Sequence, residues 1–134
     1  ALILFNEAGV PCVFWGDLLG SPDSDDLPAV RELPILMSIR ARAAVGPQHN
    51  AFDNPDVVGF AREGKDEVPG SGCAVILSDR MAAEKTLYVG ARNAGQEWEC
   101  IIGDHPSVRV ADDGTLTGVV SDGGLSVYVP RRSA

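Results

Sequence analysis

The sequence predicts an antiparallel β-sandwich for residues 47–134, preceded by a short α/β segment in residues 1–46. Two observations lead to this fold class. From Asp56 onward the chain breaks into short pieces rich in β-forming residues, and turn-forming residues separate these pieces. The first segment instead follows the order helix, strand, loop and helix, which is typical of an α/β protein. Gly46 and Pro47 stand between the two patterns and mark the expected boundary.

The α/β segment contains four expected elements. Residues 1–8 should end an apolar helix, because Gly9 is well placed to stop it in the left-handed conformation. Residues 10–16 (VPCVFWG) are apolar on both faces, which is typical of a fully buried strand in a parallel sheet. Residues 17–28 carry turn-forming and acidic residues and predict a loop. Residues 29–45 place apolar side chains at helical spacing, so we expect a second helix there.

The β-rich part divides into seven expected strands. Leu125, Val127 and Val129 alternate with their neighbours, as they would in a half-buried strand. Asp113-Gly114 is one of several turn signals between the pieces. About seven short strands with this spacing predict two packed antiparallel sheets with hairpin and Greek-key connections. The expected strands cover residues 57–62, 73–78, 86–91, 97–102, 108–111, 116–120 and 125–129.

Charge and cysteine content limit the possible partners and leave the compartment open. The chain carries 11 basic and 19 acidic residues, a net charge of −8, so it should repel nucleic acid and anionic membranes. Its longest apolar run is far shorter than the ~20 residues that span a bilayer. Cys12, Cys73 and Cys100 have no metal-type spacing, and we expect three buried free thiols. Free thiols favour a cytoplasmic location slightly over a secreted one.

Three segments carry a recognisable pattern. Residues 9–17 read GVPCVFWGD, residues 48–64 read QHNAFDNPDVVGFAREG, and residues 87–98 join LYVG to NAGQEW. The first segment resembles the last barrel strand of the α-amylase family, family 13 of the glycoside hydrolases. The other two resemble domain C of its liquefying bacterial and intracellular fungal members. Similar positions run in order from Leu2 to Val129, so the resemblance covers nearly the whole chain.

The resemblance implies a C-terminal β-sandwich preceded by the last β-α unit of a (β/α)8 barrel. Residues 1–46 would be the end of the catalytic barrel, and residues 47–134 would be domain C. A lone β-α unit cannot close a barrel, because its strand lacks both neighbours. We therefore expect this chain to be a fragment whose natural partner is the missing N-terminal barrel of the same protein.

The resemblance also implies the activity of the parent protein. Family members hydrolyse internal α-1,4-glucosidic bonds of starch or glycogen with retention, using two carboxyl groups about 5 Å apart. In the family these groups lie on earlier barrel strands, so we expect no catalytic residue here and no activity from this chain alone. The parent would bind α-glucan, and this piece would stabilise its barrel. Exo-acting and transglycosylating specificities stay open.

Five residues are candidates for roles near substrate or metal. Trp15 and Asp17 follow the expected barrel strand, at the end where barrel loops form active sites, although a structural role is the alternative for both. Asp56 and Asp79 match positions where the liquefying amylases hold calcium between barrel and domain C. The backbone carbonyl of Pro55 would add a third oxygen. The other ligands would come from the barrel, so the resemblance implies only a partial calcium site.

A second hypothesis is a stand-alone, non-catalytic carbohydrate-binding or structural β-sandwich. It requires at least two of Tyr88, Trp98 and Tyr128 to lie exposed side by side for sugar contacts. The same aromatic residues also fit the core or rim of a sandwich. His49 and His105 stand alone in the sequence and do not indicate zinc.

Overall fold

The structure is a computed structural model that describes residues 2–20 and 28–132, except for the side chains of Leu2 and Trp15. Its helices are α1 (Leu2–Phe5), α2 (Trp15–Leu19), α3 (Leu33–Arg42) and the 3-10 turn η1 (Ala91–Asn93). Its strands are β1 (Gln48–Ala51), β2 (Val57–Arg62), β3 (Cys73–Ser78), β4 (Ala83–Tyr88), β5 (Glu97–Ile102), β6 (Val108–Arg109), β7 (Thr115–Val120) and β8 (Leu125–Pro130). Among the described residues, no helix is both long and apolar enough to cross a membrane.

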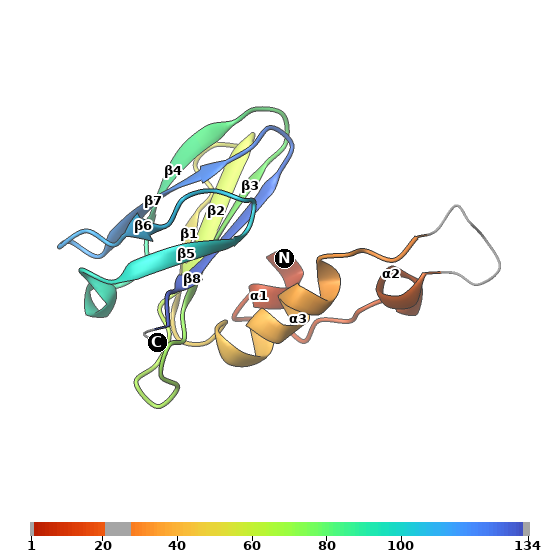
Figure 1. Cartoon of the computed structure of the whole chain (residues 1–134), viewed down its shortest axis with the longest axis horizontal. Helices are drawn as coiled ribbons and strands as arrows, with labels where there is room; N and C mark the ends of the chain where they lie inside the picture. Colours follow the sequence, from red (N-terminus) through yellow and green to blue (C-terminus); the bar gives the residue numbers. More distant parts are fainter. Residues whose placement is uncertain (1, 21–27, 133–134) are drawn as a thin grey trace.

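The strands form two antiparallel sheets. One sheet has six strands in the order β1-β2-β3-β8-β5-β6, and the other pairs β4 with β7. Figure 1 shows the sheets as layers, with α1 and α3 beside the six-stranded sheet. This arrangement confirms the expected β-sandwich. Strands that are neighbours in space but distant in sequence, such as β3 and β8, give the sheet its crossovers.

The central strands of the six-stranded sheet are buried on both faces. Side chains alternate along a strand, so Phe60 and Val75 pack with the helices while Ala61 and Ala74 pack with β4 and β7. The pairing of β2 with β3 places Phe60 opposite Val75 and Ala61 opposite Ala74. The molecule therefore has three layers: helices, a six-stranded sheet, and a two-stranded sheet.

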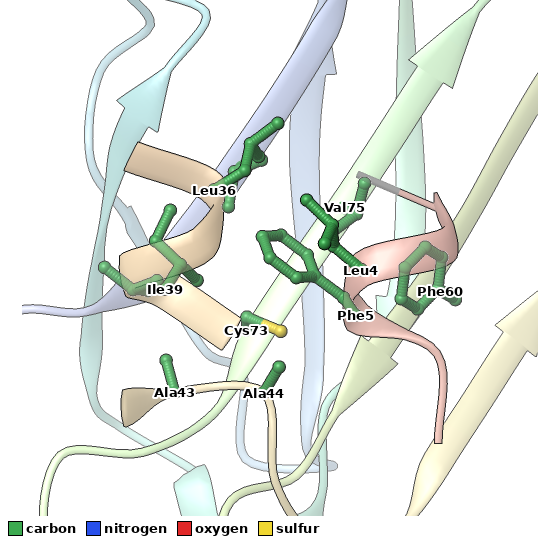
Figure 2. Close-up of a cluster of buried hydrophobic side chains, with 11 residues drawn as sticks. Leu4, Phe5, Leu36, Ile39, Ala43, Ala44, Phe60, Cys73 and Val75 are labelled. Atoms are coloured by element: carbon green, nitrogen blue, oxygen red, sulfur yellow. The ribbon is translucent and has the colours of Figure 1, made fainter. Parts of the chain in front are cut away.

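The helical layer joins the sandwich through one apolar cluster. Figure 2 shows Phe5 of α1 between Leu36 and Ile39 of α3 and the strand residues Cys73 and Val75. Phe5, Ile39 and Cys73 are fully buried. Burial raises the pKa of the Cys73 thiol to about 12, so the thiol stays protonated and neutral in this core. Residues on both sides of the expected boundary thus share one core.

The strand expected over residues 10–16 is absent. Residues 10–14 are irregular, and α2 begins at Trp15. A parallel strand needs neighbours that accept and donate its hydrogen bonds, whereas every strand pair in the described part of the chain is antiparallel. The apolar sequence of this segment therefore lacks the sheet that would make it a strand.

Other differences are smaller. The first helix ends at Phe5, before Gly9, although Gly9 does adopt a φ of 85°. Strand β1 was not expected, because Gln48–Ala51 has few β-forming residues, and it forms by pairing with β2. Cys12 is exposed, which corrects its expected burial, and Cys73 alone of the three cysteines is fully buried. Residues 21–27 of the expected loop lie outside the described residues.

Candidate interface and metal site

Large apolar side chains are exposed mainly before residue 38. Val10 is 92% exposed and Phe14 is 66% exposed. Ile3, Val13 and Phe14 line one groove, and exposed apolar side chains that lie together in this way mark a contact with another molecule or domain. We refer to these side chains as the N-terminal apolar surface; they are Ile3, Val10, Val13, Phe14, Leu19, Val30, Ile35 and Met37.

A groove of about 460 Å³ runs through this surface. Asp17 lies at the groove with its side chain exposed, and its backbone joins two segments. The amide of Asp17 donates to the Phe14 carbonyl at 3.1 Å, and its carbonyl accepts from the Val30 amide at 2.7 Å. Among the described residues that line the groove, Asp17 is the one carboxylate. The side chain of Trp15 lies outside the described residues.

The two candidate calcium ligands lie at the same end of the β2–β3 pair. Asp56 directly precedes β2 and Asp79 directly follows β3, and the register pairs Val57 with Ser78. The amide of Asp79 donates to the carbonyl of Asp56 at 2.9 Å. Both side chains are exposed, and Arg80 Nε lies 3.4 Å from Asp79 Oδ2. Antiparallel pairing therefore brings together the backbones of two acidic residues that stand 23 positions apart in the sequence.

These oxygen donors suit calcium in kind but are too few to hold it. Calcium takes about six to eight oxygen ligands, and the Asp56 carbonyl is already used by the Asp79 amide. With one oxygen from each, the carboxylates of Asp56 and Asp79 and the carbonyl of Pro55 leave at least half of such a set to be supplied by other groups. Across residues 2–20 and 28–132, no group of three or more His, Cys, Asp or Glu side chains could hold a metal ion.

Tyr88, Trp98 and Tyr128 do not form a sugar-binding platform together. Trp98 and Tyr128 are fully buried, whereas Tyr88 is 42% exposed. The Tyr128 hydroxyl donates to the Val119 carbonyl at 3.3 Å and accepts from the Val119 amide at 3.0 Å, and burial raises its pKa. Two of the three rings thus belong to the sandwich core. The carbohydrate-binding form of the second hypothesis therefore lacks the pair of exposed aromatic residues that it required, whereas its structural form does not depend on them.

The two histidines have structural partners. His49 Nε2 lies 2.9 Å from Glu63 Oε1, and its ring packs edge-on against Tyr88 with a centroid separation of 4.8 Å. His105 Nε2 lies 3.4 Å from the hydroxyl oxygen of Ser121. These contacts tie turns and strands of the sandwich together.

Sequence reasoning missed a hollow of about 690 Å³ between the β1–β2 turn and β4. Phe52 and Met81 line it and are each 51% exposed. Lys85 Nζ donates to Asp53 Oδ1 at 2.6 Å and to the Val57 carbonyl at 3.0 Å. The available signal was an aromatic residue within the polar sequence Asn-Ala-Phe-Asp-Asn, which the sandwich core does not need.

Relatives of known activity cover almost all of this chain. An α-amylase of Geobacillus stearothermophilus is 36% identical over 135 residues, 99% of this chain, and an α-amylase of Bacillus licheniformis is 38% identical over 98% of it. A cytoplasmic α-amylase of Escherichia coli is 36% identical over 96% of the chain. This chain spans 24% to 28% of the length of these relatives. No family model matches the sequence.

Solved structures support the same fold. An Anoxybacillus α-amylase superposes with a TM-score of 0.64 at 18% identity, covering 98% of this chain and 31% of that protein. A variant of AmyP crystallised with maltotriose superposes with a TM-score of 0.53 at 13% identity over 87% of this chain. At these identities the superpositions establish the fold.

Proposed function

This chain is a homologue of the α-amylases, and on that premise we propose that it is the C-terminal portion of such an enzyme. The observation that carries the proposal is sequence identity of 36% to 38% over nearly the whole chain, combined with coverage of about a quarter of each relative. In the proposed parent, residues 1–46 complete the catalytic barrel and residues 47–134 form domain C. The parent would hydrolyse internal α-1,4-glucosidic bonds of starch or glycogen with retention.

The chemistry of the proposed parent lies outside this chain. Retaining hydrolysis needs a nucleophilic carboxylate and an acid/base carboxyl group about 5 Å apart, and we place both on the earlier barrel strands. Trp15 and Asp17 would lie near substrate, since they follow the segment proposed as the last barrel strand. In the complete barrel, the neighbouring strands would give residues 10–16 the hydrogen bonds of a sheet.

The proposed role of this piece is to stabilise the barrel. The sandwich holds α1 and α3 through the cluster around Phe5 and through arginine hydrogen bonds to the helical segment. Those helices and the segment between them carry the N-terminal apolar surface, which would pack against the rest of the barrel. The sandwich would therefore act as a rigid support for the last barrel elements.

Calcium would add a second link between the two domains. Asp56, Asp79 and the Pro55 carbonyl would hold one side of the ion, and barrel oxygens would complete its coordination. The bound ion would supply a cross-link between domains. Because this chain offers only part of the ligand set, its own affinity for calcium should be low.

Starch hydrolysis tests the assignment. The pure 134-residue chain should release no reducing sugar from soluble starch, while a protein in which it is joined to an α-amylase barrel should do so. The same barrel without this piece should lose activity at a lower temperature. Hydrolysis by the pure chain would contradict the proposal, and so would a barrel whose thermal inactivation is unchanged by this piece.

A further inference from the structure

The hollow beside Phe52 has the composition of a binding site for a polar, uncharged ligand. It lies between the β1–β2 turn and β4, which belongs to the two-stranded sheet. The buried residues of that sheet form a cluster separate from the one that contains the helix residues. The volume of about 690 Å³ is in the range of small-ligand pockets. Its wall combines two exposed apolar side chains, Phe52 and Met81, with the amide and carboxylate groups of Asn50, Asn54 and Glu84.

One ion pair links the two walls of the hollow. The Lys85 side chain is only 9% exposed, and its ammonium group bridges Asp53 Oδ1 at 2.6 Å and the Val57 carbonyl at 3.0 Å. This bridge joins the β1–β2 turn to β4, so it holds the two walls of the hollow next to each other.

The charge of the hollow disfavours anions. Lys85, its described cation, is paired with Asp53, and Glu84 adds a further negative charge. The chain as a whole carries a net charge of −8. Phosphorylated or carboxylated ligands would be repelled, whereas a neutral molecule rich in hydroxyl groups could donate to these carboxylates and amides.

A pyranose ring meets these conditions. It has an apolar C–H face that packs on an aromatic ring, and its hydroxyl groups point outward toward polar partners. Phe52 offers a half-exposed ring surrounded by such partners. We propose that this hollow binds a neutral gluco-oligosaccharide, with Phe52 stacking on a sugar ring and Asp53, Asn54 and Glu84 accepting or donating hydrogen bonds. The choice of an α-1,4-linked ligand rests on the proposed function. The inference that the hollow binds a sugar does not, because it rests on the residues that line the hollow.

Titration of the 134-residue chain with maltoheptaose, followed by amide chemical shifts, tests the proposal. We expect saturable binding with a dissociation constant in the millimolar range, and the largest shifts in residues 50–54 and 83–86. Phe52→Ala should weaken binding by about tenfold or more, because it removes the stacking surface. Phe14→Ala is the matched control, since Phe14 is also exposed, at 66%, but lies in the apolar groove.

The outcomes separate the proposal from its rivals. Absence of saturable shifts, or equal binding by Phe52→Ala and the unaltered chain, would overturn it. Loss of binding in Phe14→Ala alone would also overturn it and assign the sugar to the N-terminal groove. Equal affinity for cellohexaose would support the sugar site and contradict its α-glucan specificity. Retained starch hydrolysis by a barrel fusion carrying Phe52→Ala would show that the proposed function does not depend on this site.

Discussion

The guanidinium group of Arg62 donates a hydrogen bond to the backbone carbonyl of Phe5, with Nη1 and the oxygen 2.8 Å apart. The same side chain donates from Nε to the Gly46 carbonyl at 2.8 Å, and it is 7% exposed. Phe5 and Gly46 lie in the segment proposed to belong to the barrel, whereas Arg62 ends strand β2. A buried cation thus fastens the helical segment to the sandwich.

Replacing this cation should cost substantial stability. Arg62→Met keeps an apolar stem but removes hydrogen bonds to two carbonyls, and we expect the free energy of unfolding to fall by about 2–4 kcal/mol. Urea unfolding followed by circular dichroism measures this free energy of unfolding. The control is Arg109→Met, because Arg109 also donates to a carbonyl, that of Gly95 at 3.0 Å, but is exposed. Equal losses in both variants would contradict a special role for Arg62.

The buried aromatic residues should matter for stability and not for sugar contact. Trp98 is fully buried, so Trp98→Ala should lower the free energy of unfolding by about 3–5 kcal/mol. Phe52→Ala should change it by less than about 1 kcal/mol, because half of that side chain already meets solvent. Thermal and urea unfolding of the two variants checks this contrast. A small effect at Trp98 would mean that the sandwich core is not packed as described.

The N-terminal apolar surface should bind hydrophobic probes in the isolated chain. We expect fluorescence enhancement of a dye such as anilinonaphthalene sulfonate, reduced by Phe14→Ser with little change in unfolding free energy. In a fusion with the barrel, the same substitution should instead destabilise the protein, because Phe14 would then be buried. Unchanged dye binding in Phe14→Ser, or an equally small effect in the fusion, would contradict the proposed interface.

Calcium should have little effect on the isolated chain. Because three residues alone contribute oxygens to an ion that takes about six to eight, the site at Asp56 and Asp79 should shift the melting temperature by less than about 1 °C in millimolar calcium. A barrel fusion should be stabilised by calcium, and Asp79→Asn should remove that stabilisation. A melting temperature that rises strongly with calcium in the isolated chain would show that the described ligand set is incomplete.

The bond between Lys85 and Asp53 should give a pH-dependent contribution to stability. Its hydrogen bond lowers the pKa of Asp53 below that of the unfolded chain. The stabilisation is therefore present above the unfolded-state pKa of about 4, and it is lost as the pH falls through the lower folded-state pKa. We expect Asp53→Asn to be less stable than the unaltered chain at pH 7 and equally stable near pH 2. A difference independent of pH would contradict this account.

The sandwich could be predicted closely because its strands are bounded by turn-forming residues. Strands β2, β3 and β5 have the expected bounds, and the remaining predicted strands differ at their ends. Strand β1 could not be found from propensity, since it owes its conformation to pairing with β2. The strand predicted over residues 10–16 does not form, for the opposite reason. Their composition suits a parallel strand, but the described part of the chain provides no parallel neighbour.

The candidate sites could be predicted only in part. The resemblance assigned Asp56 and Asp79 to one calcium position, and the register between β2 and β3 explains why the two residues lie side by side. The burial of Trp98 and the exposure of Phe52 depend on which face of a strand or turn meets the second sheet. Sequence patterns give the alternation along a strand but not the layer that covers each face.

The central claim is that this chain forms part of an α-amylase whose catalytic carboxylates lie elsewhere in the same polypeptide. The intact mass of the protein, purified from the organism that makes it, tests this claim most directly. The relatives are about four times as long as this chain, so the account predicts a polypeptide several times heavier than 14.1 kDa. A native mass of 14.1 kDa would contradict it and would leave a protein without a catalytic barrel.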